Sequence, residues 1–204
     1  MEREALVAMH IVSEIQDFKP IGSGVTRSTG VHLTDILKRI EAKLGLGYTG
    51  TGFRDRWLTM DIGFVWEQVL SRAYGDRAAT RPGEIVLDGV ACSPDGIGTD
   101  DEVIAGVPGD GGLVLEEYKC TWRSSRRDIA DNWIWMAQTK AYLKAVSEDL
   151  GVPLRTVLFR VLYLMGCYDG SGPAYMVARI RFDQEEIDRM WEMVLEEKAL
   201  MERG

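Results

Sequence analysis

The sequence has few cysteines and no long hydrophobic run, and each shortage excludes a class of protein. Its three cysteines, Cys92, Cys120 and Cys167, stand singly, which indicates neither a disulfide framework nor a CxxC metal site. No apolar stretch reaches the length of about eighteen residues that a membrane-spanning helix needs. The chain opens on the letters MERE, a charged start that differs from a signal peptide. We therefore expect an intracellular protein with no membrane partner.

Basic residues are in the minority. There are 24 Lys and Arg against 32 Asp and Glu, which gives a net charge of −8. Contacts to phosphate normally come from clustered Lys and Arg, so this balance argues against nucleic acid unless the basic residues are gathered locally. Two such gatherings exist: Arg123, Arg126 and Arg127 follow one another closely, and Arg54 and Arg56 open a predicted helix.

A chain of 204 residues that is 46% hydrophobic and 27% charged is typical of one globular domain. Helical and strand patterns alternate along it, and no linker or repeat divides it. We therefore predict a single α/β domain with a mixed central β-sheet flanked by helices. It has a helical N-terminal part (1–75), a sheet core (84–182) and a C-terminal helix (183–204). The predicted helices cover 4–17, 35–44 with Thr34 as N-cap, 54–74, a segment from Ser125, and 184–201; the predicted strands cover 84–91, 103–106, 113–120, 156–165 and 174–182.

The most informative pattern is a Pro-Asp turn followed by a strand with acid and amine on one face. Asp95 follows Pro94 in a turn, and Glu117 and Lys119 lie two residues apart on the next apolar strand, so they share a face. If the two strands pair, Asp95 and Glu117 converge where Mg²⁺ or Mn²⁺ could bind, because hard cations prefer carboxylate oxygens. Lys119 would then help orient a water molecule that attacks a phosphodiester.

Two neighbouring acids compete for these roles. Glu116 adjoins Glu117, but its odd spacing from Lys119 should turn it to the other face of the strand. Asp88 precedes Asp95, but it lies inside the strand pattern of residues 84–91 and has no proline before it. The pattern therefore favours Asp95 and Glu117.

Two helices supply further candidates. Gln138 and Tyr142 are four residues apart in the helical segment after the Glu-Tyr-Lys strand, so they share one face. Glu67, in the predicted helix 54–74, could ligate a metal directly or through water.

These elements, in this order, resemble the PD-(D/E)xK nuclease superfamily and, within it, the RecB-like branch that includes lambda-exonuclease and YqaJ-type proteins. The resemblance spans residues 63–142 and implies a restriction-endonuclease-like core. It implies catalytic roles for Asp95, Glu117 and Lys119, and metal ligation by Glu67, Asp95 and Glu117. Gln138 and Tyr142 would line the site near the substrate. Apart from the resemblance, Arg123, Arg126 and Arg127 follow Lys119 closely in sequence, so we expect them to contact the substrate.

The resemblance also implies a function. The expected protein is a Mg²⁺- or Mn²⁺-dependent deoxyribonuclease, an exonuclease acting at DNA ends in phage-type recombination or repair, in the cytoplasm of a bacterium or phage-infected host. DNA is the expected partner, with a single-strand annealing protein and a homo-oligomer implied by family alone. Three scattered cysteines cannot supply the four ligands of an iron–sulfur cluster, so none is expected. A restriction-like or structure-specific endonuclease, or a non-catalytic DNA-binding subunit, remains the alternative.

Aromatic residues and serines around the basic cluster allow two interpretations. Trp133, Trp135 and Met136 could stack on bases, although aromatic residues on a buried helix more often belong to the core. Ser124 or Ser125 could simply be the N-cap of a solvated helix that carries the arginines.

Overall fold

The computed structural model describes residues 29–46, 56–74 and 79–203, with residues 56–60 described by their backbone alone. The helix predicted at 4–17 and Arg54 lie outside the described residues, and so does the side chain of Arg56. The described α-helices are α1 (Leu33–Lys43), α2 (Arg56–Tyr74), α3 (Trp133–Leu150) and α4 (Gln184–Arg203), with one 3-10 helix, η3 (Ile129–Asp131).

A mixed four-stranded sheet forms the centre of the molecule, in the order β4-β7-β8-β9. Strand β7 pairs antiparallel with β4 and parallel with β8, and β8 pairs antiparallel with β9. The parallel pair needs a crossover, which α3 provides. The predicted class, a mixed sheet flanked by helices, is therefore confirmed. The strands are β4 (Gly96–Thr99), β7 (Leu113–Thr121), β8 (Thr156–Tyr163) and β9 (Ala174–Arg181).

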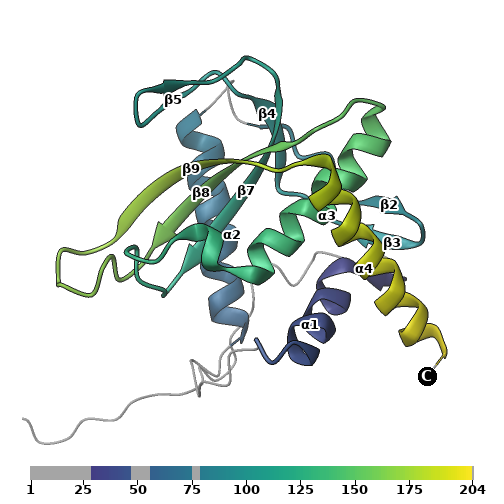
Figure 1. Cartoon of the computed structure of the whole chain (residues 1–204). Helices are drawn as coiled ribbons and strands as arrows, with labels where there is room; N and C mark the ends of the chain where they lie inside the picture. The colour runs from purple at the N-terminus through teal and green to yellow at the C-terminus, as the bar shows by residue number, and fades with distance from the viewer. Residues whose placement is uncertain (1–28, 47–55, 75–78, 204) are drawn as a thin grey trace, which may run out of the picture.

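Helices cover both faces of this sheet. Helix α2 crosses one face, and α3 lies over the other with α1 and α4 packed beside it (Figure 1). Side chains alternate across a strand, so β7 serves two layers: Leu115, Glu117 and Lys119 face α3, whereas Val114 and Glu116 face α2. Strand β8 follows the same rule and places Phe159 on the α3 side.

Two smaller sheets correct the predicted strand boundaries. Where one strand was predicted at 84–91, the structure has a hairpin of β2 (Ile85–Leu87) and β3 (Val90–Cys92), and β3 also pairs with β1 (Val31–His32). Asp88 therefore lies in a turn with φ of 49°, not inside a strand. Its carboxylate accepts a 2.8 Å hydrogen bond from Trp191 Nε1.

The strand predicted at 103–106 is likewise too long. It is β5 (Val103–Ile104), which turns back through Ala105 and Gly106, both at positive φ, into β6 (Val107–Pro108).

Two predicted helix starts are wrong. Helix α1 begins at Leu33, so Thr34 lies in its first turn and His32 holds the N-cap position. Helix α3 begins at Trp133 rather than near Ser125, and neither Ser124 nor Ser125 caps it. The residues between form a turn that leads into η3, where the carboxylate of Asp128 accepts a hydrogen bond from the Ala130 N–H.

The core lies between the sheet and the helices α1, α3 and α4. The predicted packed face of the last helix, Ile187, Met190, Trp191 and Val194, is buried in it as expected. None of the helices described is long and apolar enough to cross a membrane.

Candidate active site

The Pro-Asp turn and the Glu-Tyr-Lys strand lie side by side. Asp95 immediately precedes β4, whose first residue, Gly96, pairs with Glu116 on β7. The Asp95 carboxylate accepts a 2.8 Å hydrogen bond from the backbone N–H of Tyr118, between Glu117 and Lys119. Antiparallel pairing of β4 with β7 thus brings together the residues that the sequence singled out.

A chain of hydrogen bonds joins this strand to α3. The Lys119 ammonium donates to a Glu117 carboxylate oxygen, and also to Gln138 Oε1 at 3.1 Å. The Gln138 amide donates in turn to the Tyr142 hydroxyl at 2.9 Å. The four side chains form one network, and the predicted shared face of Gln138 and Tyr142 is confirmed.

Burial controls the charges at this site. The Glu117 side chain is 1% exposed, and burial, opposed by the Lys119 charge, raises its pKa to about 8. Burial also raises the pKa of Asp95, against the attraction of Lys119. Burial disfavours the charged form of Lys119 as well, but the Glu117 and Asp95 carboxylates outweigh it and hold the Lys119 pKa above its usual value. Lys119 therefore stays protonated, whereas burial opposes the ionisation of both carboxyl groups.

Glu67 approaches from α2. Burial and the nearby Asp95 charge raise its pKa, and Arg81 opposes both. Its carboxylate accepts a 3.1 Å hydrogen bond from Arg81 Nη1. Arg81 is a neighbour that the sequence analysis missed, because no local pattern links residue 81 to residue 67.

The donor set fits a divalent cation. The oxygen Glu117 Oε2 is buried and finds no hydrogen-bond partner among the described residues, an arrangement that costs free energy unless a cation or water completes it. No group of three His, Cys, Asp or Glu side chains in the described ranges is gathered to hold a metal ion. Asp95 and Glu117 would thus be the direct ligands, which suits Mg²⁺ because it commonly binds one or two carboxylates and otherwise water and phosphate.

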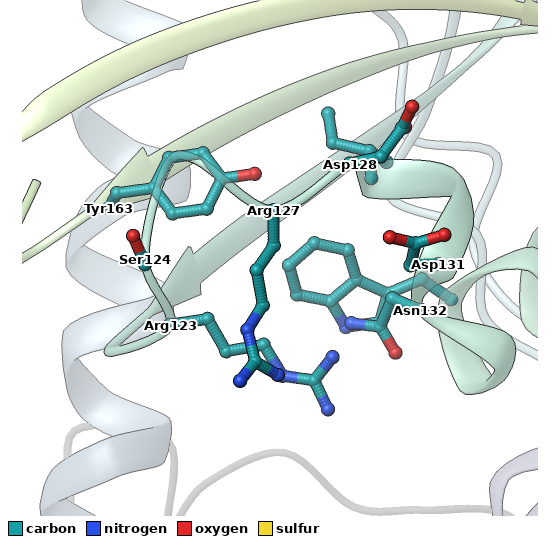
Figure 2. A pocket seen from close by; sticks show the side chains of 9 residues that line it. Arg123, Ser124, Arg127, Asp128, Asp131, Asn132 and Tyr163 are labelled. Carbon is teal, nitrogen blue, oxygen red and sulfur yellow. The ribbon is translucent and has the colours of Figure 1, made fainter. Parts of the chain in front are cut away.

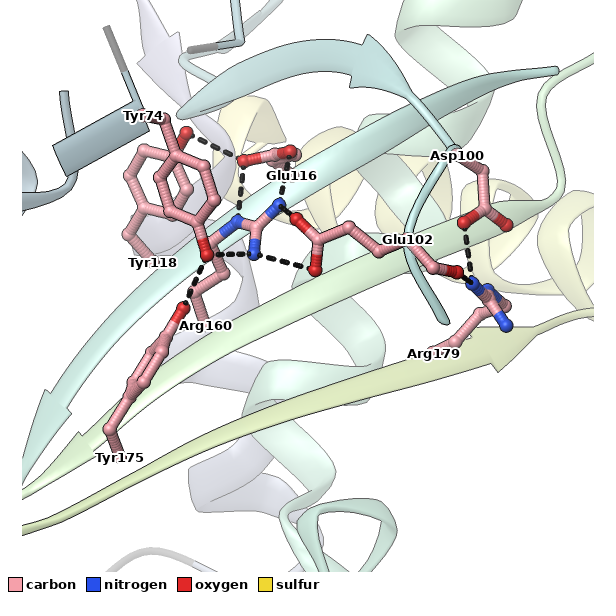
Figure 3. Close-up of polar contacts among 8 residues, drawn as sticks. All are labelled: Tyr74, Asp100, Glu102, Glu116, Tyr118, Arg160, Tyr175 and Arg179. Atoms are coloured by element: carbon pink, nitrogen blue, oxygen red, sulfur yellow. Dashed lines mark hydrogen bonds and ion pairs between the residues drawn. The ribbon is translucent and has the colours of Figure 1, made fainter. Parts of the chain in front are cut away.

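The opposite face of β7 has a separate polar network (Figure 3). Glu116 turns away from Lys119, as predicted, and its two oxygens accept hydrogen bonds from the buried Arg160 at 2.8 and 2.9 Å. Arg160 also donates to Glu102 and to the Tyr74 hydroxyl. The Tyr118 hydroxyl donates to Glu116 at 2.8 Å. Tyr118, whose backbone N–H binds Asp95, is thus held in place by a hydrogen bond on the opposite face of the sheet.

The predicted arginine cluster divides. Arg123 and Arg127 line one cavity with Trp135, whereas Arg126 is 73% exposed and lies 3.9 Å from Asp169. Met136 is buried in the core, so the core interpretation holds for it. Trp133 and Trp135 are half-buried against the core, and Trp135 also borders the cavity.

Comparison with known proteins gives a weak likeness. No protein-family model matches the sequence, and no curated protein matches it. Among solved structures, the chain is similar to SSO0001, with 16% identity, a TM-score of 0.44, and coverage of 85% of this chain and 78% of that one. It is similar to LHK-Exo in complex with dAMP, with 18% identity, a TM-score of 0.44, and coverage of 85% and 88%.

It is also similar to a second structure of LHK-Exo, an alkaline exonuclease from Laribacter hongkongensis, with 17% identity, a TM-score of 0.41, and coverage of 85% and 88%. At these identities and TM-scores the likeness by itself assigns no activity and no residue to this chain.

Proposed function

We propose that this protein is a Mg²⁺- or Mn²⁺-dependent nuclease that hydrolyses phosphodiester bonds in DNA. The observation that carries the proposal is the buried oxygen Glu117 Oε2, which has no hydrogen-bond partner among the described residues and belongs to the carboxylate that binds Lys119. A structural ion pair needs only one acid for one lysine. Here Asp95 and Glu117, both with raised pKa values, adjoin the Lys119 ammonium, and the pKa of Glu67 is raised as well; this excess of acids is typical of a site that accepts a cation.

Each residue has a distinct task. A bound divalent ion would supply Lewis acidity and lower the pKa of water. Asp95 and Glu117 would hold it, and Glu67 would act through water. Lys119, kept protonated by its carboxylate neighbours, would orient the attacking water and offset charge that develops on the phosphate. Gln138 fixes the Lys119 ammonium through its 3.1 Å hydrogen bond, and Tyr142 fixes Gln138.

The finer assignment extends the sequence resemblance. We propose that the enzyme acts as an exonuclease at DNA ends, in phage-type recombination or repair, in the cytoplasm. A single-strand annealing partner and a homo-oligomer come from that resemblance alone.

The test is cleavage of end-labelled linear duplex DNA beside a closed circle, each with Mn²⁺, Mg²⁺ or chelator. Wild type should degrade the linear DNA only, and only with metal. Lys119→Ala should slow cleavage by about 100-fold or more, as for loss of one preorganised electrostatic donor. Lys198→Ala serves as the matched control, because Lys198 on α4 pairs with Glu202 instead.

Intact DNA under every condition would overturn the nuclease proposal and favour a binding subunit. Equal rates for wild type and Lys119→Ala would overturn the role of Lys119. Conversion of the closed circle to a nicked or linear form would show endonuclease activity and overturn the exonuclease assignment.

A further inference from the structure

A cavity lies between the C-terminal end of β8 and the start of α3. Its volume is about 200 Å³, and Arg123, Arg127, Asn132, Trp135 and Tyr163 contribute to its lining (Figure 2). Figure 2 shows the guanidinium groups of Arg123 and Arg127 reaching toward the same space, and Trp135 belongs to the same lining. The cavity therefore combines positive charge with aromatic surface.

The sheet register places this cavity next to the proposed catalytic residues. Trp135 stacks on Phe159 with 6.4 Å between ring centroids, and Phe159 is the β8 partner of Glu117. Tyr163 lies two residues beyond Val161, the β8 partner of Lys119. Trp135 also precedes Gln138 by about one helical turn. If the scissile phosphate of a DNA strand lies at Lys119, a neighbouring nucleotide of the same DNA strand could therefore reach the cavity.

The side chains around the indole are held in place. The Arg123 guanidinium lies 6.0 Å from the Trp135 ring centroid, in cation–π range. The buried Asn132 amide, with its oxygen turned to face donors, accepts hydrogen bonds of 3.2 Å from both Arg123 Nη1 and Trp135 Nε1. This orientation follows from the donors around it, since both are N–H groups. One amide thus orders the ring and the cation together.

The lining favours a nucleobase over a free phosphate. Two carboxylates, Asp128 and Asp131, also line the cavity; they would repel a phosphate but can accept hydrogen bonds from the N–H groups of a base. A volume of about 200 Å³ is below the 300–1,000 Å³ of pockets for drug-sized ligands. It suits one flat ring system and is too small for a base pair.

We propose that this cavity binds one unpaired nucleobase of the DNA strand being cut, adjacent to the scissile phosphodiester. The base stacks on the Arg123 guanidinium, which lies over the Trp135 ring. Asp128 and Asp131 accept hydrogen bonds from the edge of the base, and Arg127 contacts the flanking phosphate. The assignment rests on the proposed nuclease function and deepens it, because it defines the substrate as a frayed or single-stranded segment.

The experiment compares two single strands of equal length and charge in chelator, one normal and one with every base removed. Binding is measured by fluorescence anisotropy for wild type, Trp135→Leu, Arg123→Gln and the control Arg155→Ala. Leucine keeps apolar contact with Phe159, and circular dichroism checks folding. Arg155 is exposed at the opposite end of β8, so its loss removes one positive charge far from the cavity.

Wild type should bind the normal strand about tenfold or more tightly than the abasic strand, the range expected for one stacked base. Trp135→Leu should bind the normal strand about tenfold more weakly, with little change in its affinity for the abasic strand. Arg123→Gln should reduce the preference for the normal strand by a smaller factor. Arg155→Ala should keep it. If Trp135→Leu fails to fold, the test is the comparison of Arg123→Gln with Arg155→Ala: only Arg123→Gln should weaken the preference for the normal strand.

An unchanged preference in Trp135→Leu, an equal loss for both strands, or no binding of either strand would overturn the cavity assignment. Cleavage activity is scored separately. Metal-dependent cleavage without a preference for the normal strand would support the nuclease proposal and overturn the base-binding role of the cavity. A preference for the normal strand without cleavage would support base binding and overturn the nuclease proposal.

Discussion

Glu117 shows how one side chain can connect stability to metal binding. It is fully buried, and one of its oxygens accepts a hydrogen bond from Lys119, whereas the other has no partner within the part of the chain that the structure describes. Burial makes the neutral acid comparatively favourable at neutral pH and raises the pKa to about 8. A divalent cation reverses this preference, because only the carboxylate binds it well. Proton and metal should therefore compete for the same oxygens.

The first prediction is a pH-dependent stability of the metal-free protein. The folded pKa of Glu117 lies above its unfolded value of about 4.5, so the folded state binds more protons between these values and stability falls as pH rises from about 4.5 to about 8. Asp95 and Glu67 shift in the same direction. The raised pKa of Lys119 acts only in the alkaline range.

Denaturant unfolding in chelator at several pH values measures this slope. Glu117→Gln, which cannot ionise, should flatten it, and saturating Mn²⁺ should stabilise wild type most at high pH while releasing protons. A slope that is the same in wild type and Glu117→Gln would contradict the assignment.

At the scale of elements, β7 is the strand on which the site depends. One face carries Glu117 and Lys119 against α3, and the other carries Glu116 into the network around Arg160. Arg160 lies on β8 and reaches Glu102, in the segment between β4 and β5, so a single guanidinium links three segments of the chain. A second cation on this face, Arg179, bonds Asp100 at 2.7 Å (Figure 3).

The second prediction concerns this linkage. Arg160→Met should destabilise the fold by about 3–5 kcal/mol, because it leaves the buried Glu116 carboxylate without its cation. The double variant Arg160→Met with Glu116→Gln should recover part of that loss, since Glu102 is more exposed and can be hydrated. Urea unfolding of the wild type, both single variants and the double variant measures the coupling. A single-variant loss under about 1 kcal/mol would contradict a network of this strength.

For the whole molecule, charge distribution matters more than net charge. The chain carries −8, yet Arg123 and Arg127 gather at one cavity and Arg126 adjoins it in sequence. Local positive charge on an acidic protein predicts weak, salt-sensitive DNA binding with few phosphate contacts.

The third prediction is the size of that salt dependence. Phosphate contacts by Arg126 and Arg127 on a single strand should give a slope of about −1.4 for the logarithm of the binding constant against the logarithm of salt concentration. Arg127→Ala should make the slope shallower by about 0.7, and Arg155→Ala should leave it unchanged. Titrations at a series of salt concentrations measure it, and a slope near zero would rule out binding through these arginines.

Several features of this protein could be predicted from local sequence. Strand period placed Glu117 and Lys119 on one face and Glu116 on the other, and helical period paired Gln138 with Tyr142. The strands near 113–120, 156–165 and 174–182 were recognisable because each reads as an apolar or alternating run of strand length. Periodicity reports which face of an element is buried, and it is a property of neighbouring residues.

Tertiary structure decided the rest, because it depends on contacts between residues far apart in the chain. The hairpin turn at Asp88 is stabilised by Trp191, the carboxylate of Glu67 meets Arg81, and Glu116 meets Arg160 across the β7–β8 pair. The late start of α3 at Trp133 is what leaves Arg123 and Arg127 in a loop around a cavity. Sequence by itself determined the chemistry present on each strand and helix; only packing determined the burial that raises the pKa of Glu117, since desolvation comes from atoms that distant segments contribute.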